Sequence, residues 1–226
     1  MRISIIIPAL NEAGSIGPLL TEIASVTVHQ VIVVDNGSTD GTAKAALVGG
    51  AEVILEPRHG YGFACAAGAA AAIGDILVFL DGDGSFSPAE LPDLVAPIAC
   101  QNADMVLGTR AYNRLISGIM PFHQRLGNRL VVWLLKLFYG IPLTDLGPYR
   151  AIRRELLLAL DMQEHTYGWP LEMIIKMARR HCRIVELPVT YLPRRAGKSK
   201  VGGTVRGSFL AGYRFFRVLF RYLFSD

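Results

Sequence analysis

The sequence predicts an α/β protein whose central sheet is mostly parallel and flanked by helices. Through the first half of the chain, short runs rich in β-branched residues alternate with segments that suit helices. The runs are continuously apolar, which is typical of strands buried on both faces of a parallel sheet. A chain of 226 residues with 51% hydrophobic composition is long enough to form one domain with a sizeable core.

The expected strands follow one another at regular intervals. The runs ISIII, QVIVVD, EVILE, ILVFLD and DMVLG predict strands at 3–7, 30–35, 52–56, 76–81 and 104–108. The segments between them, such as 12–25 and 61–72, suit helices. We expect one domain over 1–205, followed by an amphipathic helix over 206–226.

The basic residues gather in the last quarter of the chain. The net charge is +4, and between Lys176 and Arg221 twelve Lys or Arg residues stand against one acid, Glu186. This balance suits anionic partners such as phosphates or an acidic membrane surface, and it is too mild to indicate nucleic acid. The three cysteines have no metal-ligand spacing and are odd in number, so we expect no disulfide framework and a reducing compartment.

We expect neither a secretory signal nor a membrane-spanning segment. The first apolar run has only five residues before a proline, and no uncharged apolar stretch reaches about 18 residues. The last segment is apolar but carries Arg214, Arg217 and Arg221 on one helical side. Such a helix suits a membrane interface, a subunit contact in a homo-oligomer, or ordinary packing. We therefore expect a cytoplasmic protein that lies peripherally on the cytoplasmic face of a membrane.

Small, turn-forming and acidic residues follow the predicted strands. In an open parallel sheet, ligands bind beyond the carboxyl ends of the strands, so these residues are candidates for one site. For the aspartates after the second strand, a turn and helix cap is the alternative interpretation. The candidates, strand by strand, are Pro8, Ala9, Asn11 and Glu12; Asp35, Asn36, Gly37 and Ser38; Arg58, His59 and Gly60; and Asp81 and Asp83.

The stretch FLDGDGSF contains the sharpest chemical signal. Asp81 and Asp83 repel each other unless a proton or a cation lies between them, and carboxylate oxygens at this spacing suit Mg²⁺ or Mn²⁺ holding a diphosphate. Gly82 and Gly84 leave room for such a ligand. A polar loop before the next helix explains the following Ser-Pro pair but gives no reason for both aspartates.

The stretch HGYGFAC permits a different interpretation. Gly60 and Gly62 follow a strand and open a helix, as a dinucleotide-binding fingerprint would, and an aspartate lies about 20 residues further on. However, Cys65 replaces the third glycine, and the element follows the third strand rather than the first. We therefore keep an oxidoreductase only as a minor alternative.

Eight motifs in order along the chain resemble a known family. They are IIPALNE, VVDNGSTDGT, HGYGFACAAGAAAA, FLDGDGSFSP, GTR, DLGPYRAIRR, YGWPLEMIIKMARR and IVELPVTYLPRRAGKSKVGG. Together they resemble family-2 glycosyltransferases of the dolichyl-phosphate or polyprenyl-phosphate sugar synthase type. The resemblance covers almost the whole chain and implies a GT-A nucleotide-diphospho-sugar transferase fold, an inverting reaction and a divalent metal.

The resemblance also implies roles for individual residues. It places Asp83 most directly on the metal, together with Asp81, and puts Asp145 near the reacting centre. Pairing of Asp145 with Arg150 or Arg153 is the structural alternative. The residues implied for the nucleotide-sugar are Pro8, Ala9, Asn11, Glu12, Asp35, Ser38, Gly60 and Asp81. Those implied for phosphates are Arg110, Arg125, Arg194, Ser199 and Lys200.

The chain departs from the family pattern in places that bear on the substrates. Asn36 stands where many relatives have a second aspartate, and Ser85 stands where some have a glutamine on the metal. GPYR replaces the more usual S-G-[FY]-R, and Lys198 replaces a frequent acidic or amide residue. These departures leave the donor base, the sugar and the acceptor open.

The sequence therefore predicts a metal-dependent hexosyltransferase. Its donor would be a UDP- or GDP-sugar of the mannose or glucose type, and its acceptor a polyprenyl or dolichyl phosphate. An ionised phosphate oxygen needs little help from a general base, so Asp145 would orient or stabilise rather than abstract a proton. The alternatives are a soluble or glycan acceptor and, further off, a non-enzymatic membrane-surface protein with the same fold.

Overall fold

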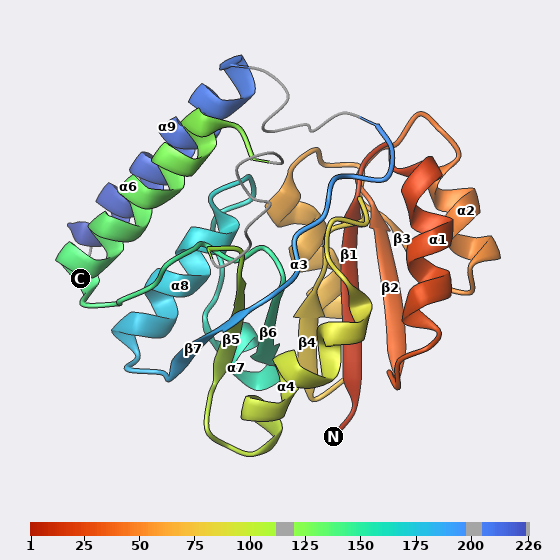
Figure 1. Ribbon diagram of the computed structural model, residues 1–226, viewed down its shortest axis with the longest axis horizontal. Helices are drawn as coiled ribbons and strands as arrows, with labels where there is room; N and C mark the ends of the chain where they lie inside the picture. The colour runs from red at the N-terminus through yellow and green to blue at the C-terminus, as the bar shows by residue number, and fades with distance from the viewer. Residues whose placement is uncertain (112–119, 198–204, 225–226) are drawn as a thin grey trace.

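The computed structural model describes residues 1–111, 120–197 and 205–224, and it confirms the α/β fold (Figure 1). A central sheet has helices on both faces. The strands are β1 (Ile3–Ala9), β2 (Gln30–Asp35), β3 (Glu52–Leu55), β4 (Ile76–Phe79), β5 (Met105–Thr109), β6 (Arg150–Arg153) and β7 (Ile184–Pro188). The helices are α1 (Ala13–Ile23), α2 (Thr42–Val48), α3 (Tyr61–Ala71), α4 (Leu91–Ala99), α6 (Phe122–Tyr139), α7 (Arg154–Ala159), α8 (Trp169–Arg179) and α9 (Val205–Leu223), with a 3-10 turn at Pro88–Glu90.

The strand order creates a crevice between β1 and β4. The order across the sheet is β3-β2-β1-β4-β6-β5-β7. β1 pairs in parallel with β2 on one side and with β4 on the other. The chain first adds β2 and β3 on one side of β1 and then returns to add β4 on the other side. In such sheets the ligand crevice lies beyond the carboxyl ends of the two strands at this reversal. The chain segments that begin at Pro8 and at Asp81 meet there.

The sheet separates two hydrophobic cores, and this explains why the strands are continuously apolar. In β1, Ile6 faces a core shared with α3, α6, α8 and α9, whereas Ile5 and Ile7 face a core shared with α1, α2 and α4. All three side chains are fully buried. Because successive side chains point to opposite faces, a strand covered on both sides is apolar at nearly every position; the buried Ser4 of β1 is an exception, and its hydroxyl donates a hydrogen bond to Gln30.

β6 runs antiparallel to both of its neighbours. Arg150, at its start, lies opposite Phe79 at the end of β4 and opposite Leu107 in β5. The sequence RAIR is short and carries an arginine at each end, so it lacks the apolar pattern that predicts a strand. Our expectations from sequence ended at the fifth strand and missed β6 and β7.

α9 packs against the body of the protein along one side. Its Leu219 is buried, and the Tyr139 hydroxyl of α6 donates a hydrogen bond to the Leu219 carbonyl at 3.2 Å. The Tyr222 hydroxyl donates to the carboxylate of Glu172, which is fully buried in α8. Glu172 also accepts the backbone N–H groups of Gln163 and Glu164. This carboxylate therefore joins α8, α9 and the loop before α8.

The outer sides of α6 and α9 carry an exposed apolar surface, which we call the α6–α9 face. The two helices lie side by side in Figure 1, and they are in contact. No helix among the described residues combines the length and the apolar character needed to span a membrane. The large apolar side chains exposed on this face are Phe122, Leu126, Trp133, Leu137 and Phe138 of α6, and Tyr213, Phe220 and Phe224 of α9 and its end. Leu130 and Phe216 are also partly exposed, but they line the cavity beyond the carboxyl ends of the strands.

Replacing Glu172 with glutamine tests the attachment of α9. Burial alone would raise the pKa of Glu172, but the Tyr222 hydroxyl, the backbone N–H groups and Lys176 hold it below its ordinary value. A carboxyl group with a lowered folded pKa stabilises the protein above its unfolded pKa and loses that effect as the pH falls. We expect Glu172→Gln to lower the free energy of unfolding by about 3 kcal/mol at pH 7.

The measurement is urea unfolding at several pH values, with the exposed Glu155→Gln in α7 as the control. The difference between wild type and Glu172→Gln should shrink below about pH 4, because the unfolded chain then binds a proton at Glu172 while the lowered pKa keeps the folded carboxylate ionised. A difference that stays constant from pH 7 to pH 3.5 would contradict the role assigned to the carboxylate charge.

Candidate active site

A cavity of about 620 Å³ opens beyond the carboxyl ends of the strands. One part of its wall is polar and comes from the ends of β1, β4, β5 and β6 and from the segment after β7. The other part, the α6–α9 wall, mixes apolar and polar side chains. The polar wall includes Glu12, Asp81, Asp83, Arg110, Arg150 and Arg194. The α6–α9 wall includes the apolar Leu130, Val131, Phe215 and Phe216 beside the polar His123, Gln124, Asn128 and Arg214.

Asp81 and Asp83 lie together at the polar end of the cavity, as expected from sequence. Asp83 is 8% exposed, and its carboxylate accepts the Ser85 backbone N–H at 2.9 Å. Burial and the neighbouring Asp83 charge raise the pKa of Asp81 well above the usual range of an aspartate. A carboxyl pair with this much unfavourable charge suits a divalent cation.

The donor set fits a metal that also binds a substrate. Within the described residues, no group of three or more His, Cys, Asp or Glu side chains lies close enough to hold a metal ion. Two carboxylates therefore supply only part of a coordination shell. Mg²⁺ in nucleotide sites is held in this way, by one or two carboxylates with phosphate oxygens and water completing the octahedron.

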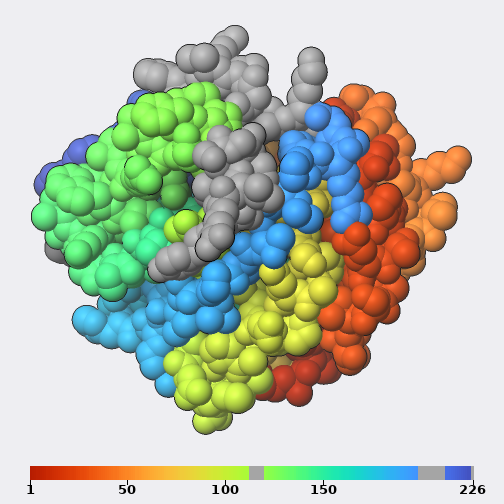
Figure 2. Space-filling model, in the orientation of Figure 1, coloured from red at the N-terminus to blue at the C-terminus, as the bar shows by residue number. Residues whose placement is uncertain are grey.

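The segment after β7 crosses the cavity beside Asp83. The Arg194 guanidinium bridges the carboxylates of Asp83, at 2.7 Å, and Glu12, at 2.5 Å. The backbone of this segment is tied to the same loop, because Arg195 donates its N–H to the Asp83 carbonyl at 3.0 Å. In Figure 2 the blue atoms of the segment lie against the yellow atoms that follow β4. Arg194 thus reaches the site from 111 residues away in the chain.

Asp35, Ser38 and Asn11 form a polar network at the ends of β1 and β2. The Asp35 carboxylate accepts the Ser38 backbone N–H at 2.7 Å, and the Ser38 hydroxyl accepts the Asn11 N–H at 2.9 Å. Asn11 has a positive φ of 52°, which an asparagine tolerates better than most residues. Pro8, Ala9 and Glu12 line the cavity, whereas these three residues are not among those lining it. Asp35 therefore makes the turn contact of the alternative interpretation.

Asn36, which follows β2, is linked through its side-chain amide to the segment that follows β3. Its nitrogen donates to the carbonyls of Glu56 and Arg58 at 3.0 and 2.7 Å, and its oxygen accepts the Gly60 N–H at 2.8 Å. An aspartate has no donor for the two carbonyls. The departure from the family pattern at this position thus has a structural reason.

Gly60 and Gly62 are explained by packing. A Cβ atom added to Gly60 would lie 2.3 Å from the His165 carbonyl oxygen, and one added to Gly62 would lie 2.6 Å from the Glu164 carbonyl oxygen. The glycines therefore let the loop before α8 approach the start of α3. This contact accounts for the spacing that resembled a dinucleotide fingerprint.

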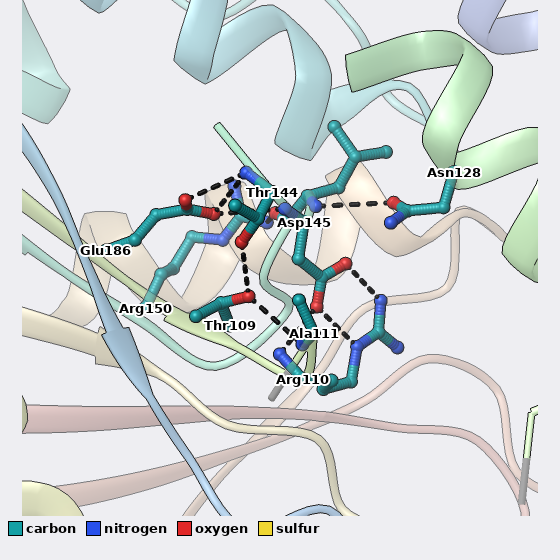
Figure 3. Close-up of polar contacts among 9 residues, drawn as sticks. Thr109, Arg110, Ala111, Asn128, Thr144, Asp145, Arg150 and Glu186 are labelled. Atoms are coloured by element: carbon teal, nitrogen blue, oxygen red, sulfur yellow. Dashed lines mark hydrogen bonds and ion pairs between the residues drawn. The ribbon is translucent and has the colours of Figure 1, made fainter. Parts of the chain in front are cut away.

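Asp145 pairs with Arg110, not with Arg150 or Arg153 (Figure 3). Arg110 Nε and Nη2 each donate to the Asp145 carboxylate at 2.7 Å, and the Arg110 backbone N–H donates at 3.0 Å. Arg150 instead donates to the backbone carbonyls of Leu146 and Pro170.

Asp145 is buried behind Arg110, and of the two residues only Arg110 lines the cavity. Burial alone would raise the pKa of Asp145, but the charge and hydrogen bonds of Arg110 lower it below the ordinary value. Asp145 is 2% exposed and is not among the residues that line the cavity, whereas Arg110 lines it. The carboxylate therefore holds the guanidinium, and the guanidinium faces the cavity.

Of the remaining phosphate candidates, only Arg125 lies among the described residues, and it does not line the cavity. The Arg125 guanidinium lies over the Phe122 ring, 5.8 Å from its centroid, and Arg125 is not among the cavity-lining residues. Ser199 and Lys200 lie outside the described residues.

Sequence reasoning did not assign site roles to Arg150, Tyr191 and Glu186. Arg150 is 1% exposed and lines the cavity, and Tyr191 lines it beneath Arg110, whose guanidinium carbon is 5.3 Å from the ring centroid. Glu186 is the one acid between Lys176 and Arg221, and its isolation in this basic segment could have marked it as a candidate for a site role.

The fold and the site together define a nucleotide-diphospho-sugar transferase of the GT-A-like class. The family model for glycosyl transferase family 2 matches residues 4–159. The chain therefore belongs to glycosyltransferase family 2 and is an enzyme that transfers a sugar from a nucleotide-sugar. This finding excludes the oxidoreductase and the non-enzymatic alternatives.

Relatives of this chain match it over nearly its whole length. An uncharacterised glycosyltransferase of Mycobacterium tuberculosis is 40% identical over 218 residues, which cover 96% of this chain and 97% of the relative. An undecaprenyl-phosphate mannosyltransferase of Micrococcus luteus is 34% identical over 225 residues, which cover 92% of this chain and 90% of the relative.

The fold also matches solved structures. Glucosyl-3-phosphoglycerate synthase of Mycobacterium tuberculosis in complex with UDP has a TM-score of 0.78 and 26% identity, over 98% of this chain and 80% of that chain. The same synthase has been solved with Mn²⁺, UDP-glucose and phosphoglyceric acid, with a TM-score of 0.74 and 25% identity over 98% of this chain and 79% of that chain.

Replacing Asn36 with aspartate tests the structural role of the amide. We expect Asn36→Asp to lower the free energy of unfolding by about 2–4 kcal/mol, because a carboxylate can replace neither the buried hydrogen bond to the Glu56 carbonyl nor the partly buried one to the Arg58 carbonyl. The measurement is urea unfolding, with Asn102→Asp, at an exposed asparagine, as the control. Unchanged stability in Asn36→Asp would show that the amide contacts do not hold this corner.

Proposed function

We propose that this glycosyltransferase moves a mannose- or glucose-type sugar from a UDP- or GDP-sugar to a polyprenyl phosphate, with inversion, at the cytoplasmic face of a membrane. One observation carries the proposal. A single cavity joins a polar wall, which suits a nucleotide diphosphate, to a wall on α6 and α9 where Leu130, Val131, Phe215 and Phe216 form an apolar part, and these helices also expose the α6–α9 face. An acceptor with a phosphate head and an apolar chain matches both walls.

At the donor end, the two aspartates would hold the diphosphate through Mg²⁺ or Mn²⁺. The metal would supply Lewis-acid stabilisation of the charge that develops on the departing nucleoside diphosphate. Asp83 accepts a hydrogen bond from Arg194, and the same guanidinium pairs with Glu12. Structures of the 25%-identical synthase with Mn²⁺ or with Mg²⁺ and UDP support a metal here.

At the reacting centre, arginines offset the repulsion between two anionic substrates. Arg110, Arg150 and Arg194 all line the cavity. They would stabilise negative charge on the diphosphate and on the acceptor phosphate, with most effect where charge develops. An acceptor phosphate oxygen would attack the anomeric carbon from the side opposite the leaving diphosphate. Since that oxygen is already ionised, Asp145 would orient Arg110 rather than remove a proton.

The acceptor end is supported by the chemistry of the α6–α9 face. Trp133 and Leu137 are 55% and 58% exposed, and Arg217 and Arg221 are also exposed on α9. Aromatic and aliphatic side chains flanked by arginines suit the interface of an anionic bilayer. The 34%-identical mannosyltransferase, whose name specifies undecaprenyl phosphate, supports the same acceptor.

A soluble phosphorylated acceptor is the second candidate. The solved structures that this fold resembles belong to a synthase bound to phosphoglyceric acid, and they favour such an acceptor. The polar wall serves either acceptor, because both carry a phosphate group. With a soluble acceptor, the α6–α9 face would instead contact a second copy of the chain in a homo-oligomer.

The first test is sugar transfer from a panel of radiolabelled UDP- and GDP-sugars, with Mn²⁺ or Mg²⁺, in the presence of a polyprenyl phosphate or of phosphoglycerate. We expect label in the organic phase from one donor, and only with the lipid and the metal. Label that appears only in a phosphoglycerate product would replace the lipid with the soluble acceptor. Asp83→Asn should reduce transfer by on the order of 10³-fold, because the metal loses a ligand, whereas the exposed Asp93→Asn should not.

The second test is cosedimentation with vesicles of phosphatidylcholine and phosphatidylglycerol. We expect the double variant Trp133→Ser/Phe220→Ser to bind at least about tenfold more weakly than wild type, because each side chain would lose roughly 1.5–3 kcal/mol of apolar burial. Leu47→Ser, at an exposed leucine of α2, is the matched control. Equal binding of all three proteins would remove the α6–α9 face from the proposal.

A further inference from the structure

We infer that Glu186 is a positioning residue that holds Asp145, and through it Arg110, in the geometry needed for transfer. Glu186 lies in β7, opposite Leu107 of β5, and its side chain extends to the loop before β6 (Figure 3). It has no contact with Arg110 among the described hydrogen bonds and ion pairs. Its effect on the cavity therefore passes through the backbone that carries Asp145.

The Glu186 carboxylate receives two consecutive backbone N–H groups. The Thr144 N–H donates to Oε2 at 2.8 Å and to Oε1 at 3.0 Å, and the Asp145 N–H donates to Oε1 at 3.0 Å. Two converging N–H groups make a small concave site for an anion. A charged acceptor strengthens these bonds relative to a neutral one.

The loop that carries Asp145 depends on side chains for its position. Residues 144–146 lie outside any helix or strand, and their backbone N–H groups donate to side chains rather than to backbone carbonyls. The third of these bonds is longer, from the Leu146 N–H to the Asn128 oxygen at 3.3 Å. Two further contacts hold the same loop. The Thr144 and Thr109 hydroxyls lie 2.8 Å apart, and Arg150 donates to the Leu146 carbonyl.

The geometry then continues from the loop to the cavity. Asp145 accepts both guanidinium bonds of Arg110 at 2.7 Å, so a movement of the Asp145 backbone moves the guanidinium with it. Arg110 is the member of this chain of contacts that lines the cavity. A charge aimed at a transferring phosphate group must be held closely in place to be effective, because small displacements lower the rate. Glu186 therefore acts on Arg110 through Asp145 and does not itself line the cavity.

The inference rests on the proposed role of Arg110 and is tested by two independent readouts. The first is the NMR signal of the Arg110 Nε–H group, which needs no substrate. In wild type its bond to Asp145 should give a shifted signal that exchanges slowly with water. In Glu186→Gln, where an amide faces the two N–H groups with a single oxygen, we expect this protection to fall at least about tenfold.

The second readout is the kinetics of sugar transfer. We expect Glu186→Gln to lower kcat by about 10- to 100-fold, as loss of an outer hydrogen bond around a site does, with the KM for the donor within about threefold of wild type. In Glu186→Gln/Asp145→Asn, the fall should be no larger than in Asp145→Asn alone, since both residues act through Arg110.

Asp104→Asn is the matched control. Asp104 precedes β5 at the other end of the β5–β7 pair and also accepts a backbone N–H from the β7 side, that of Arg183, at 2.9 Å. It should lower stability without changing the Arg110 signal or kcat.

Each combination of results has one meaning. An unchanged Arg110 signal in Glu186→Gln, or additive losses in the double variant, would overturn the inference. A weakened Arg110 signal with unchanged kcat would keep the structural contact but overturn the role of Glu186 in transfer, whereas the absence of any transfer by the wild type would contradict the proposed function instead. A weakened signal, a lower kcat and no additivity together support Glu186 as a positioning residue.

Discussion

The site depends on one topological constraint, the antiparallel insertion of β6 between β4 and β5. Because β6 runs against its neighbours, its first residue, Arg150, lies at their carboxyl ends, opposite Phe79 and Leu107. The loop before β6 must therefore arrive at the same edge of the sheet as Asp81. A parallel β6 would have brought this loop, with Asp145, to the opposite edge. The strand direction thus decides that Asp145 lies beside Arg110.

Within that frame, the site is a set of matched buried charges. Asp145 holds Arg110, Arg194 joins Asp83 to Glu12, and Arg150 is fixed by two backbone carbonyls. A buried charge is costly unless it is paired and hydrogen-bonded, so each group constrains the position of its partner. The arginines that suit anionic substrates are consequently oriented before a ligand arrives, which lowers the reorganisation needed during transfer.

The helices α6 and α9 each contribute side chains to the hydrophobic core, to the cavity and to the exposed surface. Leu135 and Leu219 are buried in the core, Val131 and Phe215 line the cavity, and the α6–α9 face is exposed. This division explains why the sequence of α9 could be interpreted as an interfacial helix, a subunit contact or a packing helix. An amphipathic pattern shows that the two sides of a helix meet different environments. It does not show whether the outer side meets water, a membrane or another subunit. The buried Tyr222 and Glu172 contact shows that the inner side is ordinary protein core.

The sequence by itself determined the α/β class, the first five strands, the residues at the strand ends, and the family. These follow from local patterns, because β-branched runs and turn residues act over a few positions. Only the tertiary structure decided which partners meet: Arg110 rather than Arg150 for Asp145, Arg194 for Asp83, and Glu186 for the loop that carries Asp145. These contacts span 35, 111 and 41 residues of sequence. Pairing at such separations depends on strand order and direction, which no local pattern in the RAIR segment revealed.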